Sequence, residues 1–174
     1  MKADKNGIVV RRRGLIIIGY QGIGKTTHAG KDNCVDLESS LFYLDGKRPE
    51  RWWVYYCEVA LSLANQGYTV FTSSHKEVRD YLFTASLPEH VGKVCVFCPT
   101  KLMKDEWIQR LEGRYKRTGS RKDYRALMNA KERFEENIVE LVTDSSEHGI
   151  PVYQPSAMDY DLDDYIFFMR KKYC

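Results

Sequence analysis

The sequence has no long uninterrupted run of apolar residues. Stretches such as Leu15 to Ile18 are far shorter than the roughly 20 residues of a membrane-spanning helix, and charged residues interrupt everything longer. A secretory signal would place about 7–15 apolar residues after a basic start, but Arg11 to Arg13 break the only candidate. We therefore expect a chain without a membrane segment, located in the cytoplasm.

Neither sign of charge prevails in the chain. Its 27 Lys and Arg residues against 24 Asp and Glu residues give a net charge of +3. A protein that binds nucleic acid by charge alone carries a strong basic excess. Nucleic acid is therefore not the favoured partner, although Arg11 to Arg13, together with arginines further along the chain, leave it open.

The five cysteines are an odd number on a chain long enough to fold without cross-links, so a disulfide framework is not expected. Cys95 and Cys98 have the spacing of half a zinc site. They fall in a predicted buried strand, and no second Cys or His pair lies near them in the sequence. We expect them to be core residues.

The chain has the material for one hydrophobic core. It has 174 residues, of which 43% are hydrophobic and 13% aromatic, and it contains no linker-like or repeated segment. Residues 1–174 are therefore expected to form a single domain.

Strands and helices are predicted to alternate along the chain. Leu15 to Ile18 is a compact apolar run ending at Gly19, typical of a strand buried on both faces of a parallel sheet. Apolar residues at helical spacing between 50 and 66, followed by Gly67, predict a helix with its stop signal. This alternation predicts an α/β fold with a parallel sheet and helices on both faces.

The other elements follow from the same reasoning. A short helix should start near Gly24 and end before Gly30, the segment 37–49 should be a loop, and Ser73 or Ser74 should cap the helix after the third strand. Strands are predicted at 15–18, 34–36, 68–72, 93–97 and 151–153, and later helices at 102–117, 122–143 and around 162–169.

Residues 19–26, GYQGIGKT, match the phosphate-loop pattern G-x-x-x-x-G-K-[ST] in the required context of a strand before and a helix after. Its glycines let backbone N–H groups face a polyphosphate, with the following helix dipole in support. Lys25 should reach the β and γ phosphates, Thr26 should bind Mg²⁺, and Thr27 should cap the helix or touch the α phosphate. The expected contact residues are Gly19, Gln21, Gly22, Ile23, Gly24, Lys25, Thr26 and Thr27.

Two absences narrow the class of nucleotide-binding protein. The Asn-Lys-x-Asp signature of guanine-specific switch proteins is missing. The third predicted strand ends in Val70-Phe71-Thr72-Ser73, without the acidic residue that ATPase motors use to hold Mg²⁺.

The chain resembles the small P-loop kinases, the group that includes nucleoside monophosphate kinases, shikimate kinase and gluconate kinase, over roughly residues 14–172. It also looks like the compact nucleotide kinases of phages. The resemblance rests on the phosphate loop near the N-terminus, on Asp36 with Glu38 after the second strand, and on the Arg-rich stretch 107–119. It implies a three-layer sandwich with strand order 2-3-1-4-5, an ATP·Mg²⁺ donor, a Mg²⁺ or acceptor role for Asp36, and an arginine-rich lid.

We call residues 102–125 the lid segment. Arg110, Arg114 and Arg117 are four and three residues apart and should share one helix face, where they could stabilise a transferring phosphoryl group. Arg121 and Arg125 add further positive charge to the lid segment after the predicted break at 118–120. The alternative is a solvated helix whose arginines pair with nearby acidic residues, namely Asp105, Glu106 and Glu112.

Other polar residues have competing interpretations. Asp36 could orient Mg²⁺ or take the acceptor's proton, or it could cap a turn. Ser73, Ser74 and His75 could touch the acceptor or the γ phosphate. The aromatic cluster of Trp52, Trp53, Tyr55 and Tyr56 could stack on a base, but most of it should be core. The segment 154–157 falls where the resemblance implies that adenine lies.

The sequence thus predicts a phosphotransferase that uses ATP and Mg²⁺ to phosphorylate a small acceptor, a nucleotide or a nucleoside. Lys25, Asp36, Arg110, Arg114 and Arg117 are its candidate catalytic residues, and Thr26 and Asp36 its candidate metal ligands. A polynucleotide kinase and a nucleotide-dependent switch or slow NTPase are the alternatives. A monomer and a homodimer are both compatible with the sequence.

Overall fold

Five strands form one parallel sheet in the order β2-β3-β1-β4-β5. The computed structural model describes residues 13–45, 47–88 and 91–174. The strands are β1 (Gly14–Gly19), β2 (Cys34–Asp36), β3 (Thr69–Thr72), β4 (Val91–Phe97) and β5 (Val152–Tyr153). The α/β class, the parallel pairing and the strand order are as expected.

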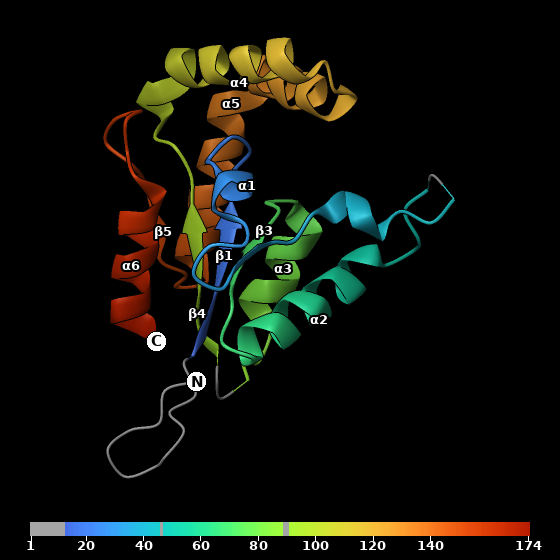
Figure 1. The fold of residues 1–174 in the computed structure, drawn as a ribbon, viewed down its shortest axis with the longest axis vertical. Coiled ribbons are helices and arrows are strands. Elements are labelled where there is room, and N and C mark those ends of the chain that lie inside the picture. The colour runs from blue at the N-terminus through green and yellow to red at the C-terminus, as the bar shows by residue number, and fades with distance from the viewer. Residues whose placement is uncertain (1–12, 46, 89–90) are drawn as a thin grey trace.

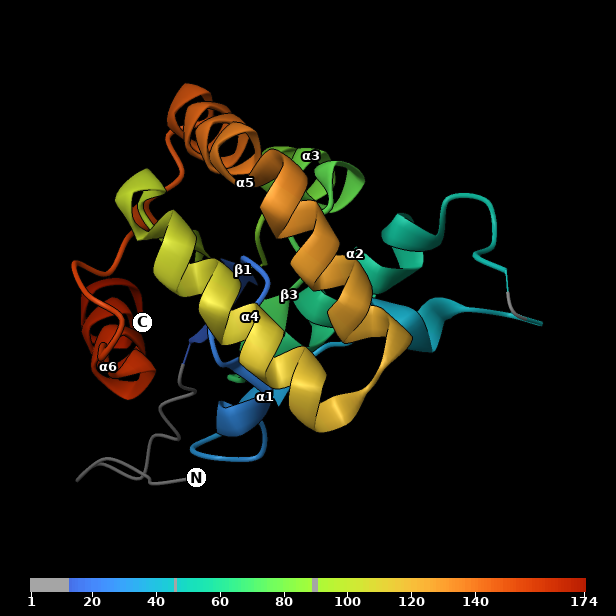
Figure 2. The same ribbon diagram turned by 90° about the horizontal axis from the view of Figure 1, so that it is seen from above.

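Six α-helices surround this sheet within the described ranges (Figures 1 and 2). α2 and α3 lie on one face and α6 on the other, whereas α4 and the start of α5 cross above the carboxyl ends of the strands. The helices are α1 (Lys25–His28), α2 (Trp52–Asn65), α3 (Lys76–Thr84), α4 (Lys104–Thr118), α5 (Arg121–Glu147), which is kinked at Arg133, and α6 (Leu162–Tyr173).

The core is centred on β1, where Leu15, Ile16, Ile17 and Ile18 are all fully buried. Burial of such side chains stabilises the fold by about 1.5–3 kcal/mol each. The run is buried on both faces because helices cover both sides of a central parallel strand. Cys95 and Cys98 are also buried, and every cysteine in the described chain is free, as expected.

The structure confirms the short first helix and corrects the expected cap of α3. α1 has only four residues, and Gly30, Asp32 and Asn33 then have positive φ angles that end any helical path. Such a short helix has too few aligned peptide units to supply the dipole expected behind the phosphate loop. Ser74 does not cap α3, because the N–H groups of Val78 and Arg79 both donate to His75 O and the helix begins one residue later.

The predicted loop at 37–49 is partly structured. It contains the 3-10 turn η1 (Ser39–Phe42) and a bridge between Leu44 and Lys47, and it projects from the body as an arm before α2 (Figure 1). Arg11 and Arg12 of the basic run fall outside the described residues. Among the described helices, none is both long and apolar enough to cross a membrane.

Candidate functional site

Two carbonyls of the loop from Gly19 to Lys25 accept hydrogen bonds from side chains outside it. Trp107 Nε1 of α4 donates to Gln21 O at 2.9 Å, and the hydroxyl of Tyr160 donates to Ile23 O at 2.9 Å. Gly22 and Gly24 have φ angles of 87° and 101°, which favour glycine. Within the described chain, the N–H groups of residues 21–26 have no backbone acceptor. N–H groups without backbone acceptors are available to bind an anion.

Lys25 is folded back over this loop. Its Nζ donates to Gly19 O at 2.7 Å. Burial lowers the pKa of Lys25 to about 8, and the nearby carboxylates of Asp36 and Glu38 oppose that shift in part. Lys25 therefore lies against the loop, and a bound anion would favour its protonated, positively charged form.

Thr26 and Asp36 lie together, as candidate metal ligands must. Thr26 Oγ1 donates to Asp36 Oδ2 at 2.8 Å. Asp36 is the last residue of β2 and pairs in register with Phe71, so the strand delivers its carboxylate to the carboxyl edge of the sheet beside the loop. A hydroxyl and a carboxylate are the oxygen ligands that Mg²⁺ takes from proteins, and this pair fits the ion.

Glu38 is held elsewhere. Both of its carboxylate oxygens accept hydrogen bonds from Lys122 Nζ of α5. This ion pair joins the segment after β2 to the end of the lid segment, so Asp36 alone of the two acids faces Thr26.

The three candidate arginines of α4 have three different environments. Arg110 stacks over Trp107 and Tyr160, with its guanidinium carbon 5.4 Å from each ring centre, and its Nη2 lies 3.9 Å from where a Gly24 Cβ would be. Arg114 pairs with the buried Asp123. Arg117 is exposed and has no ion-pair partner among the described residues. Arg110 is therefore the one held directly against the loop.

The first half of the lid segment belongs to the core. Trp107 and Leu111 are buried, and both lie against the backbone of Gly22. The expected break between the two helices is confirmed, because Gly119 ends α4 with a positive φ and the Ser120 side chain accepts from Asp123 N to cap α5. The acidic partners named in the alternative interpretation are not used by Arg110 or Arg114, and Glu112 pairs with Lys116.

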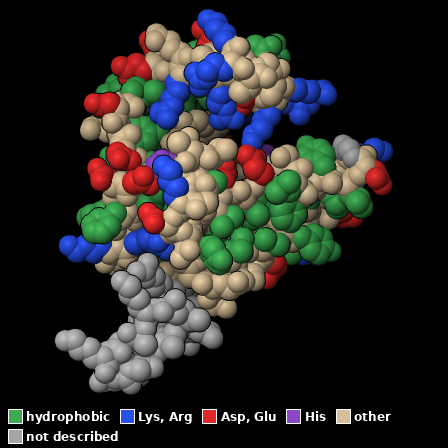
Figure 3. All heavy atoms as spheres, in the orientation of Figure 1, with side chains coloured by type: hydrophobic (Ala, Val, Ile, Leu, Met, Phe, Trp, Pro, Cys, Tyr) green, Lys and Arg blue, Asp and Glu red, His purple; other side chains and the backbone are tan. Residues whose placement is uncertain are grey.

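Lys and Arg side chains gather over the α4–α5 end of the molecule (Figure 3). A notch separates this end from the projecting arm. The notch lies at the carboxyl ends of the strands, where ligands of open α/β sheets bind.

The aromatic cluster is mostly core, as expected. Trp52 and Tyr56 are buried, and the Tyr56 hydroxyl donates to Leu37 O at 2.7 Å while accepting from Ser73 N at 2.8 Å. Tyr56 thus ties the ends of β2 and β3 together. Gln154, from the segment where the resemblance places adenine, donates to Pro99 O at 2.7 Å.

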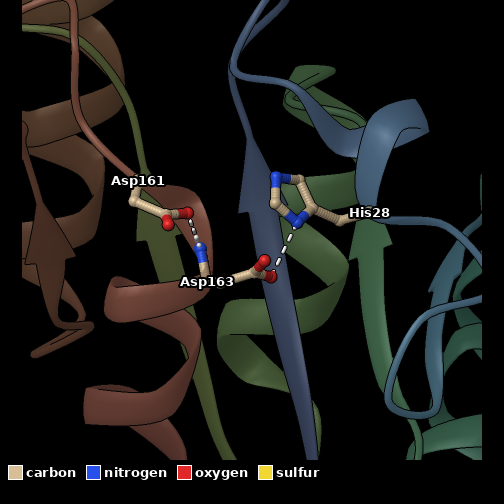
Figure 4. Close-up of side chains that lie close together, drawn as sticks. All are labelled: His28, Asp161 and Asp163. Carbon is tan, nitrogen blue, oxygen red and sulfur yellow. Dashed lines mark hydrogen bonds and ion pairs between the residues drawn. The ribbon is translucent and has the colours of Figure 1, made fainter.

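His28 of α1 and two residues at the start of α6, Asp161 and Asp163, lie close together (Figure 4). His28 Nδ1 is 2.7 Å from Asp163 Oδ1, and Asp161 Oδ1 accepts from Asp163 N to cap the helix. These bonds account for the arrangement as an ion pair and a helix cap, although the three side chains could also ligate a metal ion. No sequence signal pointed to it, since more than 130 residues separate His28 from its partners.

A shallow hollow along α5 is lined mainly by acidic residues. Its carboxylates already have basic partners: Glu135 pairs with Lys104, Glu136 with Arg133, and Glu140 and Asp144 with the buried Arg79. The hollow is therefore an ion-paired surface that fastens α5 to α3 and α4.

Sequence reasoning missed the residues that support the loop from outside. Trp107 and Tyr160 contact it across 86 and 137 positions of the chain, a separation that a local pattern cannot reveal.

Comparison with known proteins found no relative: the chain matches no protein-family model and no curated protein.

Proposed function

We propose that this protein is an ATP- and Mg²⁺-dependent phosphotransferase of the P-loop kinase type that transfers the γ phosphate to a small acceptor. One observation carries the proposal. The loop that matches the phosphate-binding pattern has N–H groups without backbone acceptors in the described chain, and Lys25 and the Thr26–Asp36 pair stand beside it.

Each residue has a role that follows from its position. Lys25 would leave Gly19 O for the β and γ phosphates, and the N–H groups of the loop would bind the remaining phosphate oxygens. Thr26 and Asp36 would hold Mg²⁺, which supplies charge neutralisation at the phosphates. Asp36 would also accept the proton of an acceptor hydroxyl.

The three arginines of α4 would have different roles. Arg110 is already fixed at the loop and would contact phosphate oxygens directly. Arg114 and Arg117 lie beyond the buried Leu111, so any closing motion of the lid segment would involve the turns after that residue. The guanidinium of Arg117 would stabilise the charge of the transferring group and exclude water, and Arg114 would have to leave Asp123 to do the same.

The cationic α4–α5 end supports a second candidate, a kinase that acts on the end of a polynucleotide (Figure 3). A polynucleotide bound through several phosphates dissociates steeply as salt rises, whereas a mononucleotide acceptor depends on salt less. A switch or slow NTPase is the third candidate, and it would have no use for the lid arginines in turnover.

The test is ADP formation from ATP·Mg²⁺ with nucleosides, nucleoside monophosphates, shikimate-like acids and 5′-hydroxyl oligonucleotides, against an acceptor-free control. We expect one small acceptor to raise the rate, and Lys25→Ala and Arg110→Gln to abolish the increase, on the order of 10²-fold or more. Stimulation by oligonucleotides alone would favour the second candidate. A rate that no acceptor changes would contradict the kinase assignment.

A further inference from the structure

His28 of α1 lies in a cluster of side chains that can ligate a metal ion. One nitrogen of His28 and one oxygen each of Asp161 and Asp163 all lie within 4.8 Å of one another (Figure 4). Successive residues of a helix are turned by about 100°, so Thr26 and His28 leave α1 in nearly opposite directions. The cluster is therefore separate from the Thr26–Asp36 pair, the candidate Mg²⁺ ligands.

The cluster combines a fixed ligand with adjustable ones. The His28 side chain is only 11% exposed, whereas that of Asp163 is 52% exposed. His28 Nδ1 and Asp163 Oδ1 are 2.7 Å apart. Two ligands of one tetrahedral zinc ion are about 3.3 Å apart, given zinc–ligand distances of about 2.0–2.2 Å. A small shift of the exposed Asp163 carboxylate would therefore admit the ion.

The hydrogen bonds of the cluster use only part of each side chain. His28 Nδ1 faces Asp163 Oδ1, and Asp161 Oδ1 accepts from Asp163 N. In the part of the chain that the structure describes, His28 Nε2 and the Oδ2 atoms of both aspartates have no hydrogen-bond partner. Each group thus keeps an atom with a free lone pair, and Asp161 can ligate a metal without giving up the cap of α6.

The start of α6 carries negative charge that no Lys or Arg of the described residues neutralises. Four aspartates lie between positions 159 and 164, and the one ion pair that any of them makes within the described ranges is that of Asp163 with His28. The positive end of the helix dipole offers only about half an elementary charge. Even with His28 protonated, more than two negative charges remain, and a divalent cation would balance them.

The donor set indicates the kind of metal. Mg²⁺ and Ca²⁺ take mainly oxygen ligands, whereas an imidazole nitrogen suits Zn²⁺ and neighbouring transition metals. One imidazole and two carboxylates supply three ligands, and water can take the fourth position of a tetrahedral zinc site.

We propose that His28, Asp161 and Asp163 bind a divalent transition metal ion, Zn²⁺ or one with similar ligand preferences, which fastens the start of α6 to α1. The two elements meet at the loop before α1, since Leu162 Cδ2 and His28 Cδ2 are each 3.9 Å from where a Gly24 Cβ would be. The ion would therefore stabilise the contact of the last helix with this loop. The proposal does not depend on the proposed phosphotransferase function.

The experiment is titration of the full chain with Zn²⁺, followed by calorimetry, and with Co²⁺, followed by the visible absorption that reports tetrahedral coordination. We expect His28→Gln and Asp163→Asn to weaken binding at least about 10- to 100-fold. Such a loss follows from changing a residue that only supports a metal ligand, so loss of a ligand should cost no less. Asp161→Asn should weaken binding too while keeping the helix cap, because Asn caps helices as well as Asp does.

Thermal unfolding gives a second measurement. Zn²⁺ should raise the unfolding temperature of the wild type, because the ion binds a site that exists only in the folded chain. The same Zn²⁺ concentration should change the unfolding temperature of His28→Gln little. Unfolding curves without metal show whether each variant is folded.

Matched variants remove the same chemical groups outside the cluster. Asp164→Asn takes one charge from the same first turn of α6, and His148→Gln takes an imidazole from the end of α5. Cys174→Ser removes the exposed thiol, and Asp36→Asn alters the other candidate metal pair. All four should bind Zn²⁺ at this site like the wild type.

The outcomes are decisive in either direction. A loss of Zn²⁺ binding in His28→Gln, Asp161→Asn and Asp163→Asn but not in the matched variants supports the site. The inference is overturned if the folded wild type binds neither Zn²⁺ nor Co²⁺, or if a folded His28→Gln variant binds them like the wild type. It is also overturned if a matched variant loses as much affinity as His28→Gln.

Discussion

At the residue scale, the charge of Lys25 is sensitive to pH in the mildly alkaline range. Burial lowers its pKa to about 8, and the negative charge of a bound polyphosphate would favour the protonated form. Below pH 8 the lysine is already protonated, and above it ATP must bind together with a proton.

We therefore expect the affinity for ATP·Mg²⁺ to fall as the pH rises from 8 to 10, by up to about tenfold per pH unit. Calorimetry at pH 7 and pH 9, in two buffers of different ionisation enthalpy, measures both the affinity and the proton uptake. Lys25→Met should bind ATP weakly and without this pH dependence. Equal wild-type affinity at the two pH values would contradict the assigned role of Lys25.

The pairing of Thr26 with Asp36 predicts a separable effect on the metal. Asp36→Asn should raise the Mg²⁺ concentration needed for half-maximal turnover by at least about tenfold, because a carboxylate ligand is lost. Binding of metal-free ATP should change little. Glu38→Gln is the matched control, since that carboxylate faces Lys122. If Glu38→Gln raised the Mg²⁺ requirement more than Asp36→Asn, then Glu38 and not Asp36 would be the metal ligand.

At the element scale, the turn between α4 and α5 depends on Asp123. Burial opposes its ionisation, but hydrogen bonds from Thr118, Arg114 and Ser120 outweigh it and hold the pKa of Asp123 below its usual range. An acid with a lowered pKa stabilises the fold fully above its unfolded-state pKa, near 3.8, and that contribution is lost as pH falls through the lower folded-state value.

Asp123→Asn should therefore destabilise the protein at pH 7, by about 1–3 kcal/mol after allowance for the partly exposed Arg114. The difference from the wild type should narrow below pH 4. Urea unfolding at pH 7 and pH 3 checks both statements, with the exposed Arg121→Gln as control. A constant difference across this range would mean that the charge of Asp123 is not what stabilises the turn.

α4 and the loop at residues 19–25 are joined by a hydrogen bond whose loss can be tested. Trp107→Phe keeps an aromatic ring but removes the donor to Gln21 O, and should cost about 1–3 kcal/mol of stability and weaken ATP binding. Trp53→Phe, on the half-buried side of α2, should affect stability alone. If Trp107→Phe binds ATP like the wild type, the loop does not need α4 to keep its shape.

At the scale of the whole molecule, local patterns predicted the parts built from neighbouring residues. β1 follows from an apolar run before Gly19, and the contact of Thr26 with Asp36 follows from a strand end beside the loop that matches the phosphate-binding pattern. Periodicity placed three arginines on one helix face, but their environments depend on Tyr160 and Asp123, which that periodicity does not describe. Ser73 and His75 were named from the sequence, but their hydrogen-bonded link to Arg48 was missed because Arg48 lies in another segment of the chain.

The most direct test of the central claim, that residues 19–26 form an ATP·Mg²⁺ site, is titration of the protein with ATP·Mg²⁺. We predict one binding site per chain and a loss of at least about tenfold in affinity for Lys25→Ala, with the exposed Lys31→Ala unchanged as control. Absence of binding to the folded wild type, or equal affinity in the Lys25→Ala variant, would contradict the account.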